Sequence, residues 1–565
     1  MLTRRQAISG ALSTIGVNLG GCATLVSPAT GVCPDDPRYT SSTTPLTIDT
    51  HVHVFNGSDI QVERYISLVR ARVTPALKYL GEILQEVGWH IAPSGTDELA
   101  LLQEISKQMR AECNAGRIEQ TIAAYRAQKY FQGLQELTRA LDIVERRYVG
   151  QPRAESADSI ADAIRSLPTE HNKLRDRLRQ QKLRGSARQE IDAALAFVLQ
   201  QFQYRYVNVL EYLSRYSSGS SRKIDLIICH QLDFDWSLAH GQPTKTSIQD
   251  QINVMEQISI LTGGRVHCFA PFDPMRQVAY DLQLIQESPL ALVQRAISSQ
   301  GFIGVKMYPP MGFAPMGNSS LSWSRWREPW IAPALQRPDI GVLLDRALLQ
   351  LYSWCIANNV PIMAHTSKSN SPSSDFEKLT KASYWQSVPA GLSVTFGHFG
   401  NTEVGLQSNL DRAKQYMKLM QPMGNHGANF YADSAYFTHA ITNPSNLKSA
   451  LRTLFKTMQG PGSVPLSERL MYGSDWEMLI IEGGDTFGYL RTFEQIFAEL
   501  SGDPSIGAEG TLSDRFFGIN AADHLSLHPG VPNSTRSRLD AFYAAKNVPK
   551  PLWATKVDML PRTVS

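Results

Sequence analysis

Residues 47–54 read Thr-Ile-Asp-Thr-His-Val-His-Val, and this octet guides the interpretation of the rest of the chain. The octet is short and rich in β-branched residues, which is typical of a β-strand. Side chains alternate between the two faces of a strand, so Asp49, His51 and His53 are expected to point the same way. Neutral imidazole is a common ligand of zinc-like ions. The octet therefore predicts half of a metal site, although a polar strand face without metal would show the same alternation.

Four later segments share one pattern, a short apolar run that ends in or near a polar residue. These segments are 302–307 with Lys306, 361–365 with His365, 393–398 with His398 and 470–475 with Asp475. Buried parallel strands are continuous apolar runs. In a (β/α)₈ barrel the carboxyl ends of all strands meet at the face that carries the chemistry. The polar residues are therefore expected to converge with the histidines of the octet.

Three further apolar runs complete a set of eight strands, at 223–229, 264–270 and 429–434. Helical patterns lie between the strands, as in 342–357. The sequence thus predicts an α/β fold, a TIM (β/α)₈ barrel formed by residues 46–57 and 223–530. Cys229 and Cys268 lie in apolar strand-like runs and are expected to be buried free thiols.

The ordered set of motifs resembles the amidohydrolase superfamily, and more narrowly its amidohydrolase-2 branch of metal-dependent TIM-barrel hydrolases. That branch is also similar to aminocarboxymuconate-semialdehyde decarboxylase. The resemblance covers about residues 45–57 and 223–530. It implies one divalent metal per chain, expected to be zinc. The motifs are His-Val-His at 51–53, Gly-Val-Lys at 304–306, His365, His398 and Gly-Ser-Asp-Trp at 473–476.

The resemblance also implies a role for each site residue. The metal ligands are His51, His53, His365 and Asp475, and Asp475 also takes a proton from water. His398 polarises the substrate carbonyl or acts as a base, and the resemblance assigns it to catalysis and not to the metal.

Lys306 has two interpretations. It binds an anionic substrate group or pairs with a carboxylate beside one metal, which is the favoured alternative, or it is carbamylated and bridges two metals. Trp323, Trp326 and Trp330 either line a substrate pocket or pack within their loop.

The predicted function is a metal-dependent hydrolase in which activated water attacks a carbonyl and cleaves a C–N or C–O bond of a small molecule. One alternative is non-oxidative decarboxylation at the same metal site, and another is a periplasmic binding lipoprotein without turnover. The formal charge of +3 in 565 residues is too small to predict a nucleic-acid partner. Neither the substrate nor the oligomeric state follows from the sequence.

Residues 58–222 interrupt the barrel after its first strand and are rich in helix formers, with helical apolar spacing in 118–143 and 187–213. Because this insertion leaves from the catalytic face, it is expected to form a lid over the site, with a dimerisation module as the alternative. Residues 531–565 form a C-terminal extension, either a helix packed on the barrel or a loose tail. His524 and His528 are expected to be exposed.

The first 22 residues resemble an export signal. Arg4 and Arg5 precede a mildly apolar stretch, as in twin-arginine signals. Leu19-Gly20-Gly21-Cys22 resembles a lipobox, which would make Cys22 a lipidated membrane anchor, and a signal cut elsewhere or an unstructured tail is the alternative. Residues 23–45 are rich in Pro, Thr, Ser and Gly and are expected to be a linker. The predicted location is the bacterial periplasm or its membrane surface. No continuous apolar run reaches the ~18 residues of a membrane span.

Overall fold

A computed structural model of the chain describes residues 41–73, 77–111, 115–149, 157–180, 187–216, 219–368, 370–401, 407–422, 429–482, 486–506 and 511–560. The predicted export signal, with Arg4, Arg5 and Cys22, and most of the linker at 23–45 lie outside the described residues.

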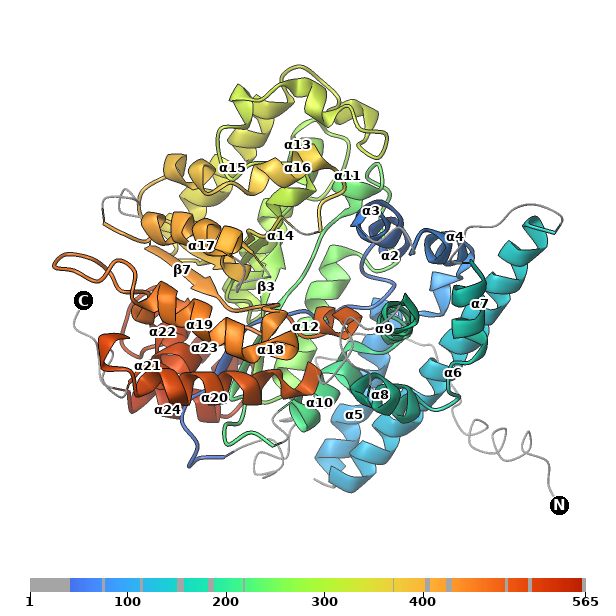
Figure 1. The fold of residues 1–565 in the computed structure, drawn as a ribbon, viewed down its shortest axis with the longest axis horizontal. Coiled ribbons are helices and arrows are strands. Elements are labelled where there is room, and N and C mark those ends of the chain that lie inside the picture. Colours follow the sequence, from blue (N-terminus) through green and yellow to red (C-terminus); the bar gives the residue numbers. More distant parts are fainter. Residues whose placement is uncertain are drawn as a thin grey trace.

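The chain folds into a TIM barrel, as the sequence predicts. Eight parallel strands follow one another in chain order around a single sheet, and each pairs with the next (Figure 1). All eight lie within or next to the predicted apolar runs. They are β1 (Ile48–Val52), β2 (Leu226–His230), β3 (Val266–Pro271), β4 (Gly304–Met307), β5 (Ile362–His365), β6 (Ser393–Gly397), β7 (Asn429–Asp433) and β8 (Leu470–Met471).

The last strand is shorter than the sequence predicts. The apolar run 470–475 suggests a full strand, but β8 ends at Met471, and Asp475 adopts a left-handed backbone conformation with φ of 58°. The barrel still closes beyond this point, because Val52 forms a parallel bridge with Trp476. The Asp475 amide also donates a hydrogen bond to the His51 carbonyl at 2.7 Å. The turn thus brings Asp475 directly beside β1.

Helices surround the barrel. In α12, Ser247 caps the helix start by accepting a hydrogen bond from the Asp250 amide, and Asp273 and Ser288 cap α13 and α14 in the same way. The helices of this layer are α11 (Asp235–Leu238), α12 (Ile248–Leu261), α13 (Pro274–Asp281), α14 (Pro289–Ser299), α15 (Ile340–Ala357), α16 (Ser374–Glu377), α17 (Gln407–Leu419), α18 (His439–Thr442), α19 (Pro444–Phe455), α20 (Tyr489–Ser501), α21 (Leu512–Asp514) and α22 (Asn520–His524).

Helix α15 is long and apolar enough to cross a membrane by length and composition alone. In the fold it is a helix of the barrel layer, with half of its apolar window buried against the rest of the chain. Its buried side includes Leu344, Leu348 and Leu351, which belong to the main hydrophobic core. These contacts explain its apolar character as that of a core helix.

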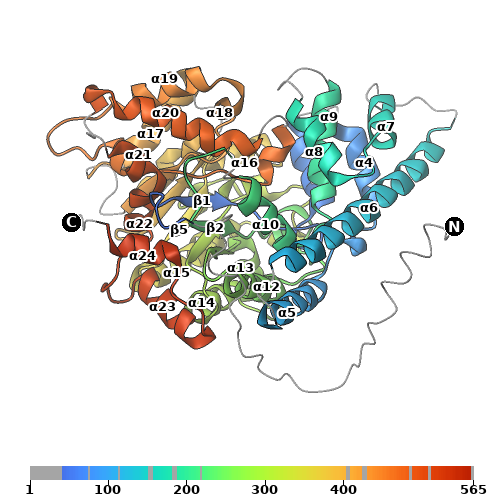
Figure 2. The same ribbon diagram turned by 90° about the horizontal axis from the view of Figure 1, so that it is seen from below.

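The insertion between β1 and β2 is helical. Figure 2 shows α4 and α6 to α9 grouped beside the barrel, with α10 leading back to it. Its elements are α2 (Val62–Arg64), the π-helical turn η1 (Tyr65–Arg70), α3 (Ala71–Val73), α4 (Lys78–Glu86), η3 (Trp89–Ile91), α5 (Gly95–Ala111), α6 (Ala115–Arg147), α7 (Ala157–Arg165), α8 (His171–Gln180), α9 (Ala187–Gln200) and α10 (Arg205–Arg215).

The C-terminal extension is packed and not loose over its described part. Helices α23 (Thr535–Lys546) and α24 (Leu552–Asp558) lie on the barrel opposite the insertion (Figure 2). The Tyr543 hydroxyl is 2.6 Å from Nε2 of His267 in β3, and Trp553 donates a hydrogen bond to the Gly264 carbonyl at 2.8 Å. Both rings share a hydrophobic cluster with residues at the start of β1 and β2. These helices therefore cover the amino-terminal end of the barrel.

The predictions about the burial of two cysteines and the exposure of two histidines have different outcomes. Cys229 and Cys268 are buried free thiols, as predicted, at paired positions of β2 and β3. The prediction of an exposed His524 is wrong. The side chain is buried, and its Nε2 lies 2.7 Å from the Thr395 hydroxyl in β6. His528 is partly exposed and pairs with Asp523.

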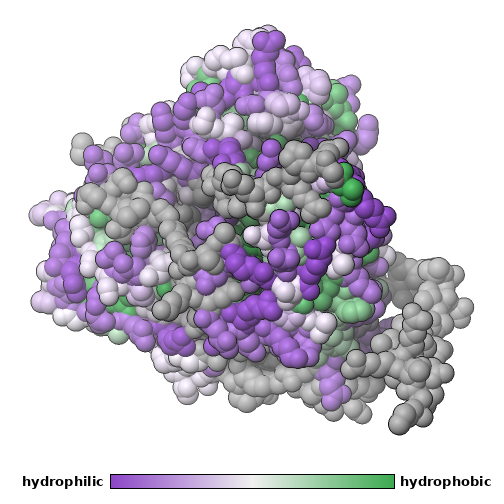
Figure 3. Space-filling view, turned by 45° about the vertical axis from the view of Figure 1, so that its right-hand side comes forward, coloured by the Kyte–Doolittle hydropathy of each residue, from purple (hydrophilic) through white to green (hydrophobic). Residues whose placement is uncertain are grey.

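The described surface is largely hydrophilic on the face that Figure 3 shows, where hydrophobic residues form small separate patches. This distribution is the ordinary one for a globular protein and marks no extended apolar docking surface on that face.

Candidate metal centre

The polar residues predicted at the strand ends meet inside the barrel, at the carboxyl ends of the strands. His51 lies in β1, Lys306 in β4 and His365 at the end of β5, while His398 follows β6 and Asp475 follows β8. Each of these side chains, like that of His53, is buried. The barrel topology thus assembles residues spread over more than 400 positions of the chain.

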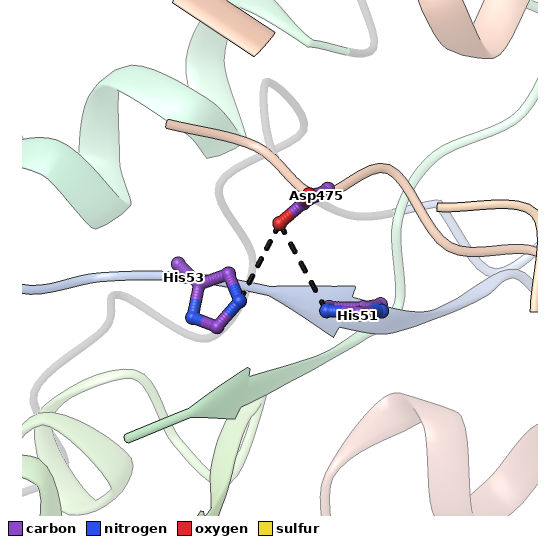
Figure 4. A group of neighbouring side chains, drawn as sticks. All are labelled: His51, His53 and Asp475. Atoms are coloured by element: carbon purple, nitrogen blue, oxygen red, sulfur yellow. Dashed lines mark ion pairs between the residues drawn. The ribbon is translucent and has the colours of Figure 1, made fainter. Parts of the chain in front are cut away.

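Three of these side chains form a compact group of potential metal ligands. Figure 4 shows His51 in β1 and His53, just beyond its end, facing the Asp475 carboxylate. The Nε2 atom of His53 is 3.4 Å from Oδ1 of Asp475, and Nε2 of His51 is 3.9 Å from the same oxygen. One ligand atom from each residue lies within 4.8 Å of both others. Two ligands of a tetrahedral zinc site are separated by about 3.4 Å. The His53–Asp475 distance equals this value, and the His51–Asp475 distance is about half an ångström longer.

The hydrogen bonds of the two histidines fix where their lone pairs point. Nδ1 of His51 is 2.9 Å from the Asp433 carboxylate, and Nδ1 of His53 is 2.9 Å from the His230 carbonyl. A carbonyl only accepts, so His53 carries its proton on Nδ1, and the same tautomer lets His51 donate to Asp433. Both Nε2 lone pairs then face Asp475. This carboxylate–histidine arrangement is the usual second shell of a metal site.

The Asp475 carboxylate supports the same interpretation. Within the described part of the chain, its Oδ1 atom is buried and has no hydrogen-bond partner. A buried carboxylate oxygen that faces two imidazole lone pairs needs a proton or a cation between the acceptors. A divalent cation at their centre would receive a coordinate bond from each of the three groups. The residues present therefore fit a zinc-like ion.

His365 and His398 form a second pair beside this group. Nδ1 of His398 is 3.0 Å from the Ala435 carbonyl, so its proton lies on Nδ1. Its Nε2 atom is 2.9 Å from Nδ1 of His365 and must accept that proton. His365 is then left with its lone pair on Nε2, the tautomer that a metal ligand needs. His365 lies outside the three-residue group, and its role as a fourth ligand stays a prediction.

Lys306 lies at the floor of the site. Its Nζ atom is 2.9 Å from the Met363 sulfur and 3.5 Å from Nε2 of His51. Burial lowers the pKa of Lys306 to about 7, although the Asp475 and Asp433 charges act in the opposite direction. The lysine therefore has a readily accessible neutral form next to a predicted ligand.

Burial shifts the pKa of the other site residues in the direction of their neutral forms. It raises the pKa of Asp433 to about 7 and lowers the pKa of His398 to about 3. Burial also raises the pKa of Asp475 well above its usual range. A bound cation would oppose the last shift, because an adjacent positive charge stabilises a carboxylate.

The backbone of the site is strained at the residues that carry the chemistry. Asp475 and Glu477 have φ values of 58° and 71°, and His398 and Phe399 have 63° and 47°. Side-chain-bearing residues rarely adopt this left-handed conformation, and each instance costs about 1–3 kcal/mol. Such strain persists where surrounding contacts impose it, and it is concentrated at functional sites. Here it aims His398 and Asp475 into the barrel mouth.

Helix α10 of the insertion supplies part of those contacts. The Tyr212 hydroxyl donates to Oδ2 of Asp49, whose Oδ1 accepts the Ser474 amide at 3.0 Å. One turn earlier, the Asn208 amide donates to Glu477 at 2.8 Å. Both contacts reach the turn that carries Asp475. The insertion is thus tied to the metal centre itself.

Replacing Tyr212 with phenylalanine should lower the free energy of unfolding by about 1–3 kcal/mol, because the buried Asp49 carboxylate loses a hydrogen-bond donor. Denaturant unfolding measures this change. The retention of metal against a chelator should also weaken, because Asp49 holds the Ser474 amide. An unchanged midpoint and unchanged metal retention would show that α10 does not support the site. Tyr125→Phe, on α6 of the same insertion, is the control.

The three tryptophans considered for a substrate pocket make contacts within their own loop and with the main core. The Trp326 indole is buried and donates to the Gly312 carbonyl at 2.6 Å, and the Arg327 guanidinium lies over the Trp323 ring. Trp330 is partly buried against the main core. Loop packing accounts for their recorded contacts, and a role in binding substrate stays a prediction.

Sequence reasoning assigned no clear role to several residues around the site. Asp433, the last residue of β7, orients His51. His230 packs against His51, with ring centroids 4.9 Å apart. Tyr308 stacks on His365 at 4.2 Å. Asp433 and His230 are the last residues of β7 and β2, and Tyr308 directly follows β4. A position at the carboxyl end of a barrel strand is the signal that could have identified them.

Comparison with known proteins adds little to this geometry. No protein-family model and no curated protein matches the chain. Similar solved structures include an uncharacterised TIM-barrel protein, Bb4693 from Bordetella bronchiseptica, at 12% identity and a TM-score of 0.34, covering 63% of this chain and 89% of that one. Another is the 5-carboxyvanillate decarboxylase LigW from Sphingomonas paucimobilis, at 11% identity and a TM-score of 0.34, covering 63% and 94%. The barrel assignment rests on the strand topology.

Proposed function

We propose that this chain is a metal-dependent hydrolase of the amidohydrolase-2 type, which cleaves a C–N or C–O bond at the carbonyl of a small molecule. One observation carries the proposal. The Nε2 lone pairs of His51 and His53 converge with a buried Asp475 oxygen that has no hydrogen-bond partner among the described residues. A cation between them would give all three groups a partner.

These residues would hold a zinc ion, which would act as a Lewis acid and make water nucleophilic near neutral pH. Asp475 has a second oxygen besides the one facing the histidines, and this carboxylate is placed to take the proton from water. His365 completes the proposed ligand set through Nε2. One ion is favoured over two, because His51, His53 and Asp475 form one group of potential ligands.

His398 fits the role of base better than that of carbonyl donor. Its proton is on Nδ1 and is donated to Ala435, so its Nε2 atom is an acceptor. Burial keeps the imidazole neutral, which suits a group that must receive a proton. In the structure, Nε2 of His398 accepts the hydrogen bond from His365. Substrate binding would have to break this bond before His398 could receive another proton.

The insertion is proposed to wall the site and not to serve dimerisation alone. Besides the contacts of α10, the Tyr65 hydroxyl in η1 donates to Asn370, beyond β5, at 2.7 Å. The segment that begins at residue 58 therefore reaches across the barrel mouth from β1 toward β5. An enclosed site excludes bulk water, which strengthens the electrostatic interactions inside it.

Turnover assays separate the proposed function from its alternatives. The purified protein should hydrolyse members of a panel of esters, lactones and amides, lose this activity with dipicolinate, and regain it with zinc. Release of carbon dioxide from carboxylic acids without hydrolysis of any panel member would establish decarboxylation instead. Absence of both reactions in zinc-containing protein would leave the non-catalytic binding lipoprotein.

We also propose export to the periplasm, on the sequence alone. Twin-arginine recognition depends on the guanidinium pair, so changing Arg4 and Arg5 to lysine should hold the full-length chain in the cytoplasm. Cell fractionation measures the result, and unimpaired export would refute the twin-arginine route. Separately, Cys22→Ala should release the exported protein from the membrane, and undiminished membrane association would refute lipidation.

A further inference from the structure

The two ends of the insertion meet beside the barrel. The chain leaves β1 through residues 56–59, and the Gly57 amide donates a hydrogen bond to the Gln201 carbonyl, just before α10, at 2.7 Å. The Ser58 hydroxyl lies 2.6 Å from that of Thr246, which precedes α12. Helix α5 of the insertion also lies beside α12 (Figure 2). Both ends of the insertion are therefore joined to the helix layer of the barrel at one place.

Three charged side chains lie at the centre of this place, Asp59, Glu98 in α5 and Arg205, the first residue of α10. We call them the stem junction. The Arg205 guanidinium forms an ion pair with Asp59, with Nε 2.8 Å from Oδ2, and the same Nε lies 3.3 Å from Oε1 of Glu98. The Arg205 backbone amide donates to Oε2 of Glu98 at 2.9 Å. Each of the three side chains is only 1% exposed.

The stem junction has two carboxyl groups for one guanidinium. Among the described residues, no other cation forms an ion pair with Asp59 or Glu98. A second ionised carboxylate in a buried site that holds one positive charge is strongly unfavourable. Burial and the Asp59 charge raise the pKa of Glu98 to about 8, although Arg205 acts in the opposite direction. The two carboxyl groups therefore hold one proton between them at neutral pH.

The other groups that face the stem junction come from each element packed against it. Burial raises the pKa of the Tyr204 hydroxyl, which keeps it neutral. Asp97, next to Glu98 in α5, accepts hydrogen bonds from Ser94 at the exposed start of that helix. The remaining groups are the amides of Asn56 and Gln251 and the Cys268 thiol of β3. The charge of the stem junction is thus set by its own three members.

The stem junction fixes the start of the helix that supports the metal centre. One turn after Arg205, the Asn208 amide donates to Glu477 at 2.8 Å, and the Tyr212 hydroxyl donates to Asp49. These contacts hold the turn that carries Asp475. A second negative charge at the stem junction would weaken the attachment of α10 at its first residue, and with it the support of that turn.

We propose that the stem junction is a proton-dependent device, which fixes α10 against the metal centre while its two carboxyl groups share a proton and loosens both when that proton is released to solvent in alkaline solution. The inference goes beyond the proposed function and needs no turnover. In the unfolded chain Glu98 ionises near its ordinary pKa of 4.5, whereas its pKa in the folded chain is about 8. The stability that this proton contributes is therefore complete below pH 4.5 and is lost as the pH rises to about 8.

The test compares the thermal unfolding midpoint of the zinc-containing full chain between pH 5 and pH 9 in the wild type and Glu98→Gln. Glutamine has the shape of the carboxyl group but cannot ionise. The wild-type midpoint should fall by about 2–5 °C relative to that of the variant over this range, because only the wild type loses the proton. Glu104→Gln, at an exposed position of the same helix, is the matched control and should follow the wild type.

The half-time of zinc loss to dipicolinate reports on the metal centre. It should be the same in the wild type and Glu98→Gln at pH 6, and about tenfold shorter in the wild type at pH 9. Asp59→Asn should remove the pH dependence as well, because it leaves one carboxylate for one guanidinium. This second variant replaces Glu98→Gln in both comparisons if Glu98→Gln does not fold.

Parallel pH profiles of the wild type and Glu98→Gln, or an equal loss of stability in the variant at every pH, would overturn the proton-dependent junction. The expected midpoint profile with identical rates of zinc loss at pH 9 would overturn its link to the metal centre. A protein that shows both expected differences and hydrolyses no ester supports the junction, and in that case the hydrolase proposal alone fails.

Discussion

Replacing His53 with alanine should abolish metal retention and lower hydrolytic activity about a thousandfold or more. His53 directs a lone pair at Asp475, and its Nδ1 proton is held by the His230 carbonyl, so its replacement removes an oriented ligand from the group. Stabilisation of transition-state charge by a metal is worth several kcal/mol, and each 1.4 kcal/mol corresponds to a factor of ten in rate. Elemental analysis and the rate of ester hydrolysis measure the two effects.

The matched control for this experiment is His90→Ala, which removes an exposed histidine of the insertion. It should retain the wild-type metal content and rate. A His53→Ala protein that folds, carries as much metal as the wild type and turns over normally would show that the group at β1 is not the metal site. A circular dichroism spectrum like that of the wild type confirms that the variant is folded.

Asp475 and His398 should differ in what their replacement removes. Asp475→Asn should abolish turnover and weaken metal retention, since the residue is proposed both as ligand and as acceptor of the water proton. His398→Asn should cut turnover by about 10²- to 10⁴-fold, the usual contribution of a general base, while metal content stays near that of the wild type. Metal analysis on both variants separates the two roles.

The same measurements decide between one metal and two. If a carbamylated Lys306 and His398 held a second ion, both Lys306→Ala and His398→Asn should lose about one equivalent of metal, on the two-metal scheme. The single-ion proposal predicts unchanged stoichiometry in both. Loss of one equivalent in each variant would therefore refute the single-ion site. The Met363 contact of Lys306 is compatible with an unmodified amine.

The strands could be predicted because a buried parallel strand has a local signature. Runs such as 302–307 and 361–365 are apolar throughout, and each ends near a residue that a metal or substrate could use. The apolar runs do not indicate which conformation the backbone adopts after a strand ends. Asp475 leaves β8 in a left-handed turn that is held by contacts with β1, and nothing in the apolar pattern marks that turn.

The residues that orient the ligands were harder to identify, because their partners are remote in the sequence. Asp433 accepts from a histidine 382 positions away, and a carboxylate at a strand end has the same sequence signature whether it orients a ligand or binds substrate. Tyr212 reaches Asp49 from an insertion whose sequence resembles no known module. The prediction of an exposed His524 rests on its loop or helix context in the sequence, whereas the side chain is buried and contacts Thr395 in β6. These features follow from tertiary packing and not from local pattern.

Crystals of the zinc-supplemented protein, measured on both sides of the zinc absorption edge, test the central claim most directly. We expect one anomalous peak per chain, within about 2.0–2.2 Å of Nε2 of His51, Nε2 of His53 and an oxygen of Asp475. Nε2 of His365 is predicted to be the fourth protein atom at that distance. An anomalous map without a peak between these side chains, at full zinc supplementation, would contradict the proposed metal centre.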